Sequence, residues 1–94
     1  MKVISEFFEI KVGMEYKVRS VPHIQASYDQ KKAIFSIDSG EMIEVLKGEF
    51  DDFPYKQRCL VTGWMTIHKE ALLKNWKKLE EDPNSSLTYI KPLQ

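Results

Sequence analysis

The chain lacks the disulfide-forming cysteines that stabilise small secreted domains and the long apolar segments that anchor proteins in membranes. It contains one cysteine, Cys59, in 94 residues, so no internal disulfide can form and a reducing compartment is expected. No apolar run approaches the roughly 18 residues of a membrane span. The opening segment, MKVISEFFEIKV, carries Glu6 and Glu9 within its apolar part, unlike a signal peptide. We therefore expect a cytoplasmic protein with no membrane contact.

The chain also lacks an excess of charge of either sign, because its 14 basic and 14 acidic side chains give a formal net charge of zero. The overall charge therefore creates no general attraction to nucleic acid, and only a local basic face would do so. The chain has just two histidines, His23 and His68. A transition-metal site would need both of them and a carboxylate. We therefore expect no metal and no cofactor.

A chain of this length predicts a single domain over residues 1–94, large enough to build a core without disulfides or metal. Apolar and polar residues alternate in the first half, which predicts a sheet over residues 1–50. Short polar turns between the strands favour an antiparallel meander, and Gly40 is expected to take a positive φ in one of them. Four strands are expected, at residues 3–18, 23–28, 33–37 and 41–50.

The second half predicts helix over residues 54–82, followed by an extended tail over 83–94 that packs on the sheet or helix. Apolar residues recur there at intervals of three and four, and a break near His68 leaves open whether one long helix or two shorter ones form. Trp64 and Trp76 are expected in the core, and Cys59 is expected to be a small buried side chain. The predicted class is α+β, with the helical part on one face of a four-stranded sheet.

The segment SVPHIQASYD places His23 and Gln25 two residues apart on a strand, where side chains share a face. One interpretation is acid–base chemistry on RNA, because imidazole transfers protons near neutral pH. The candidate catalytic residues are then His23, Gln25 and His68, and the candidate substrate-binding residues are Arg19, Tyr28 and Lys32. The other interpretation is structural: Gln25 on the wet face of a strand, and His68 packed between helix and sheet. The sequence leaves both open.

Several segments together resemble a small bacterial and archaeal family long classed as a domain of unknown function. They are VPHIQASYD, IDSGEMI, a helix signature at Trp64, His68, Leu72, Asn75 and Trp76, and the ending YIKPL. The family pattern has a second strand histidine where this chain has Gln25. The resemblance covers nearly the whole chain.

The resemblance implies a type II toxin (DhiT-like) whose partner is a small antitoxin-like protein from an adjacent gene. The acid–base interpretation of His23 and Gln25 adds RNA as a further candidate partner. His23 and Gln25 would then lie at a functional strand edge with Tyr28. Because free edge strands accept a further strand, the alternative function is a non-enzymatic interaction or regulatory module. Whether the protein is an enzyme, and its oligomeric state, stay open.

Overall fold

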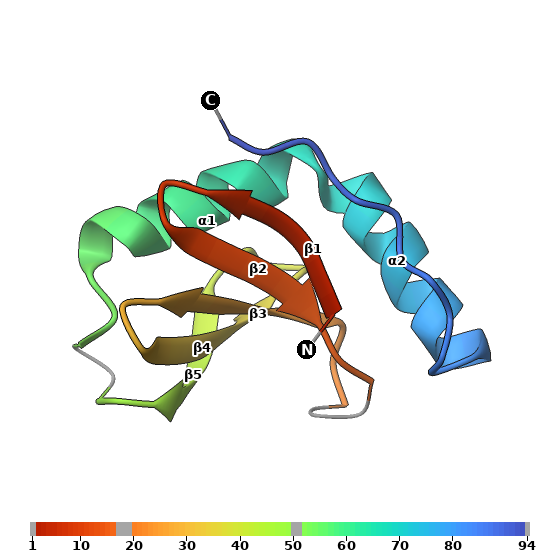
Figure 1. The fold of residues 1–94 in the computed structure, drawn as a ribbon, viewed down its shortest axis with the longest axis horizontal. Helices are drawn as coiled ribbons and strands as arrows, with labels where there is room; N and C mark the ends of the chain where they lie inside the picture. The colour runs from red at the N-terminus through yellow and green to blue at the C-terminus, as the bar shows by residue number, and fades with distance from the viewer. Residues whose placement is uncertain (1, 17–19, 50–51, 94) are drawn as a thin grey trace.

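The structure, a computed structural model, describes residues 2–16, 20–49 and 52–93. The strands form one antiparallel sheet in the order β1-β2-β3-β4-β5, and two helices follow (Figure 1). The elements are β1 Lys2–Phe7, β2 Ile10–Met14, β3 His23–Tyr28, β4 Lys31–Ser36, β5 Met42–Lys47, α1 Tyr55–Ile67 and α2 Lys69–Glu81. The α+β class and the antiparallel meander are confirmed, but the prediction of four strands is wrong.

The additional strand arises because the first predicted strand is a hairpin. Phe8 and Glu9 join β1 to β2 with φ values of 48° and 66°, and Phe7 pairs with Ile10. Two consecutive positive φ values are typical of a type I′ turn, whose usual sequence signal is Asn-Gly or Asp-Gly. Because Phe8-Glu9 carries no such signal, the alternating pattern continues through the turn and predicts one strand.

The two edge strands of the sheet, β1 and β5, differ in whether another segment covers them. In β1, a register shift leaves Ile4 as an extra, buried residue, and its carbonyl accepts a hydrogen bond of 2.8 Å from the Ile90 N–H of the tail. The tail therefore lies against the β1 edge. Among the described residues, β5 pairs with β4 alone. The β5 edge is thus the more accessible of the two.

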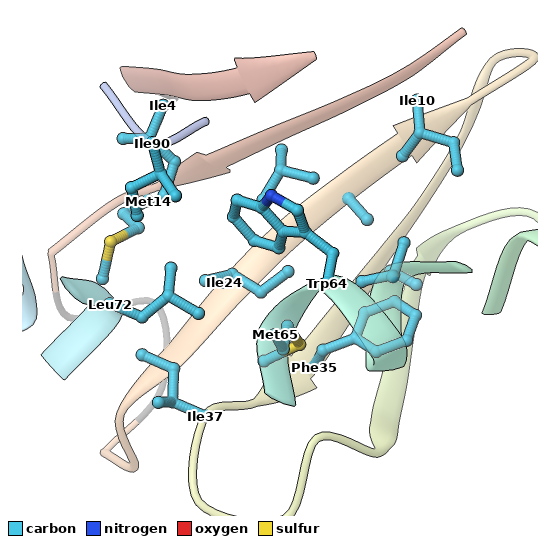
Figure 2. Close-up of a cluster of buried hydrophobic side chains, with 14 of the residues drawn as sticks. Ile4, Ile10, Met14, Ile24, Phe35, Ile37, Trp64, Met65, Leu72 and Ile90 are labelled. Atoms are coloured by element: carbon cyan, nitrogen blue, oxygen red, sulfur yellow. The ribbon is translucent and has the colours of Figure 1, made fainter. Parts of the chain in front are cut away.

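The core lies between the sheet and the helices, with the Trp64 indole near its centre (Figure 2). Trp64 comes from α1, and its ring centroid lies 5.4 Å from that of Phe7. Side chains from four strands, both helices and the tail surround it, including Ile10, Met14, Ile24, Phe35, Met65, Leu72 and Ile90. The prediction that both tryptophans are buried is confirmed.

The helical region divides at His68, which has φ −110° and ψ 21° and ends α1. Hydrogen bonding continues through the break, because the His68 N–H donates to Trp64 O and the Leu72 N–H donates to His68 O. Two helices therefore form, which was one of the two alternatives. The change of direction lets α1 and α2 each pack an apolar side on the sheet (Figure 1).

The tail is held by side chains of the helix signature. Trp64 Nε1 donates to Lys91 O at 2.9 Å. The buried Asn75 amide bonds Thr88 twice, donating from Nδ2 to Thr88 O at 2.9 Å and accepting at Oδ1 from the Thr88 N–H at 3.0 Å. The predicted extended tail therefore packs on both helix and sheet.

Gly40 has φ 74° in the β4–β5 connection, as expected, and its carbonyl accepts a 2.6 Å hydrogen bond from Thr62 of α1. Cys59 is exposed, so its predicted burial is wrong. It lies two residues before the buried Val61, about 200° around the helix, and therefore faces away from the core. In the described part of the chain, no helix is long and apolar enough to cross a membrane.

Candidate functional site

His23 begins β3 and is fully buried, with 0% of its surface exposed. Its Nδ1 lies 2.7 Å from Val21 O, and its ring centroid lies 5.0 Å from that of Trp76 on α2. A carbonyl only accepts, so Nδ1 carries the proton. In the neutral imidazole Nε2 is then an acceptor, and this nitrogen has no hydrogen-bond partner among the described residues. This geometry anchors the strand to α2.

The expected position of His23 and Gln25 at a strand edge is wrong. β3 lies in the middle of the sheet, paired with β2 along residues 25–27 and with β4 along its full length. A meander of four strands would already place residues 23–28 between two neighbours, and the hairpin at Phe8-Glu9 adds one further strand beyond β2.

Gln25 is also buried, at 1% exposure, which contradicts its predicted position on a wet face. Its Nε2 donates to Glu15 Oε2 at 3.2 Å. That hydrogen bond is the main reason that the pKa of the Glu15 carboxyl is lowered from its usual value of 4.5, and the small burial of Glu15 opposes it. Hydrogen bonding to the charged form of an acid stabilises that form. Gln25 therefore holds an ionised carboxylate at the end of β2.

Replacing Gln25 with leucine is expected to raise the pKa of Glu15 towards 4.5, because the principal stabilising donor is lost. A lowered folded-state pKa contributes stability above the unfolded value, and this contribution disappears as the pH falls through the folded pKa. Carboxyl NMR titration of both proteins measures the shift. Ser27→Ala, two residues along the same strand, is the control, and an unchanged Glu15 titration in Gln25→Leu would contradict the assignment.

His68 lies at the junction of the two helices and is partly exposed. Its ring centroid is 5.6 Å from that of Trp64, one turn earlier. It also lines an open groove of about 950 Å³ with Ile67, Lys69 and Lys74. His68 therefore packs against Trp64 of its own helical region, with one side of the residue reachable from solvent. Its predicted role in holding the helix to the sheet stays a prediction.

The remaining candidates do not converge on one site. Register places Gln25 and Lys32 on the face of the sheet away from the core, because Ala26 and Ala33 between them face the core. Tyr28 packs against the core and lines a groove with Phe8 and Leu60. Arg19 lies outside the described residues. The catalytic and substrate-binding assignments stay predictions.

The sequence analysis did not identify Lys11, Ser27 and Lys47, which lie with Lys32 on the outer face of the sheet, the face away from the core. Lys11 pairs with Ser27, Ser27 with Lys32, and Lys32 with Lys47, so the four form one row across β2 to β5. Each lies in or beside a predicted strand, but only the register aligns them. Among the described residues, no group of three or more histidine, cysteine and acidic side chains is placed to hold a metal ion.

Comparison with known proteins identifies one family. A family described as a domain of unknown function, DUF4160, matches residues 10–77. The chain belongs to this family. No curated protein and no solved structure matched it. The DUF4160 match runs from β2 into α2, so it contains the buried His23, the helix-junction His68 and both tryptophans.

Proposed function

We propose that this DUF4160 protein is the toxin component of a two-gene toxin–antitoxin module, and that its partner binds at the β5 edge. The resemblance described above suggests the class. The observation that supports the binding surface is the exposure of two large aliphatic side chains on β5. Ile43 is 45% exposed and Leu46 is 39% exposed.

Both side chains occupy β-bulges. Lys32 pairs with Lys47 and Ala33 with Val45, which leaves Leu46 as an extra residue on β5. In the same way, Ile43 lies between Met42 and Glu44, whose partners on β4 are adjacent. Bulges in an edge strand interrupt the ladder and disfavour addition of a further strand. The surface is therefore suited to side-chain packing rather than to extension of the sheet.

A groove of about 550 Å³ lies beside this edge, between β5 and α1. Met42 of β5 contributes to one side, and Tyr55 and Cys59 of α1 contribute to the other. Tyr55 is 77% exposed. Exposed apolar groups that gather around a groove are typical of protein-binding surfaces. An amphipathic segment of the partner would place apolar side chains in the groove and against Ile43 and Leu46.

The test is induced expression in a bacterial host, with and without the adjacent gene. We expect growth arrest that the neighbour relieves, together with co-purification of the two products. The double variant Ile43→Glu/Leu46→Glu should still arrest growth in the presence of the neighbour, because two carboxylates would be desolvated at the interface. Val3→Glu, on the opposite edge strand and with a parent side chain 47% exposed, is the matched control and should still be relieved.

Different outcomes reject different parts of the proposal. Unimpaired growth with the chain alone rejects the toxin assignment, and co-purification without toxicity favours the interaction module. Relief of the double variant to the wild-type level rejects the β5 surface. Circular dichroism of the purified variants confirms that each is folded.

A further inference from the structure

The two helices differ in the side chains that they expose to solvent. All six exposed residues of α2 are charged: Lys69, Glu70, Lys74, Lys77, Glu80 and Glu81. The six exposed residues of α1 include a single charged side chain: Tyr55, Lys56, Cys59, Gly63, Thr66 and Ile67. A helix on the surface of a globular protein normally carries charged and polar residues on its outer side. The outer side of α1 therefore has the composition of a surface that another protein covers.

Four of these residues form a continuous row along α1, because they follow one another at intervals of four: Tyr55, Cys59, Gly63 and Ile67. We call them the α1 row. The two ends of the row are large and exposed, with Tyr55 77% and Ile67 67% exposed, and its middle is small. Residues at this spacing form the ridges that interdigitate in the commonest class of helix packing in globular proteins. The α1 row is thus shaped to receive a second helix.

Gly63 gives the α1 row its low middle, and no contact within the chain requires a glycine there. It lies in the interior of a 13-residue helix, where glycine is less favourable than alanine. A β-carbon built on Gly63 would meet no other part of the chain within 4 Å. A glycine in a helix with no packing reason inside its own chain is suited to the close approach of a second backbone.

We propose that the α1 row is the contact between two copies of this chain, whose α1 helices pack antiparallel about a two-fold axis. A two-fold contact brings the same surface of both copies together. With the axis midway along the row, Cys59 faces Gly63 of the second copy. Tyr55 then faces Ile67 of the second copy. Each large end packs against a large end, and the backbones approach one another at the small middle.

Charge favours a second copy as the occupant of the α1 row. Contact between identical surfaces brings like charges together when charged residues lie near the axis, but the row carries no charge and the chain has zero net charge. Lys56 lies at one end of the helix, and antiparallel packing carries it towards Thr66 of the second copy rather than towards its own equivalent. The same packing places the positive end of each helix dipole beside the negative end of the other.

This inference is independent of the proposed function, because a dimer of this chain needs no product of an adjacent gene. Tyr55 and Cys59 also line the groove beside β5, so the dimer and the proposed complex would exclude one another. A single pair of short helices buries less than the roughly 1,200 Å² at which stable interfaces begin. We therefore expect a weak dimer that forms at high protein concentration.

Sedimentation velocity of the isolated chain, from about 10 to about 500 μM, tests the proposal in the range of a weak dimer. We expect the mean mass to rise with concentration from monomer towards dimer. Gly63→Ala should weaken association about tenfold, because a methyl group enters the closest contact between the helices. The same substitution should raise the melting temperature of the monomer, because alanine favours helix and its β-carbon meets open space. A loss of folding cannot produce these two opposite effects.

Ile67→Lys should also weaken association about tenfold, since it places a charge in the contact with Tyr55 of the second copy. Glu80→Gln, at an exposed position of α2, is the matched control and should leave association unchanged. A monomer at every concentration would reject a second copy as the occupant of the α1 row and would leave the proposed function standing. Association that neither Gly63→Ala nor Ile67→Lys weakens would reject the α1 row as its location.

Discussion

Replacing Trp64 with alanine is expected to lower the free energy of unfolding by about 4 kcal/mol, within the range for tryptophan-to-alanine changes in cores. The indole is fully buried at the centre of the core (Figure 2). Its ring lies against those of Phe7 and His68. Its removal leaves a cavity that surrounding side chains fill only in part, and it leaves Lys91 O without its donor. Urea denaturation followed by circular dichroism measures the change.

Two further variants separate the contributions. Trp64→Phe keeps most of the ring volume and removes the hydrogen bond to Lys91, so its loss should be clearly smaller than that of the alanine variant. Tyr55→Ala, at the exposed start of the same helix, should change stability by less than about 0.5 kcal/mol. A similar loss for Tyr55→Ala and Trp64→Ala would be inconsistent with a core centred on Trp64.

Asn75→Ala is expected to release the tail and to lower the free energy of unfolding by about 2 kcal/mol. The Asn75 amide makes two hydrogen bonds with the Thr88 backbone, and neither is replaced by another side chain when it is removed. Because Thr88 lies next to the segment that bonds β1, the Ile90 N–H should lose protection as well. Hydrogen exchange measured by NMR at Thr88 and Ile90 reports this release directly.

The matched control for Asn75 is Lys78→Ala. Lys78 Nζ also contacts Thr88, at Oγ1 and 2.8 Å, but this hydrogen bond is exposed and contributes little. The control should therefore leave the exchange rate of the Ile90 N–H nearly unchanged. If the two variants accelerate exchange equally, the tail is held by the helix surface as a whole rather than by the Asn75 amide.

Sequence patterns alone determined the class of the fold and most of the core. The alternation of apolar residues predicted strands before residue 50, and intervals of three and four predicted helix after residue 54, because each period places apolar side chains on one side. Trp64 and Trp76 were assigned to the core for the same reason. Pro83 and the polar residues after it predicted the end of the helical region, and α2 ends at Glu81.

Only the tertiary structure decided the number of strands, the burial of His23 and Gln25 on β3, and which side chains line the β5 edge. The Phe8-Glu9 turn lacks the usual residue signal, so the hairpin that adds the fifth strand is invisible in the pattern. Burial of His23 and Gln25 follows from the position of β3 between β2 and β4 and from the contacts with Trp76 and Glu15. The alignment of Lys11, Ser27, Lys32 and Lys47 depends on register between strands that are up to 36 residues apart in sequence, and register is a property of the assembled sheet rather than of any one segment.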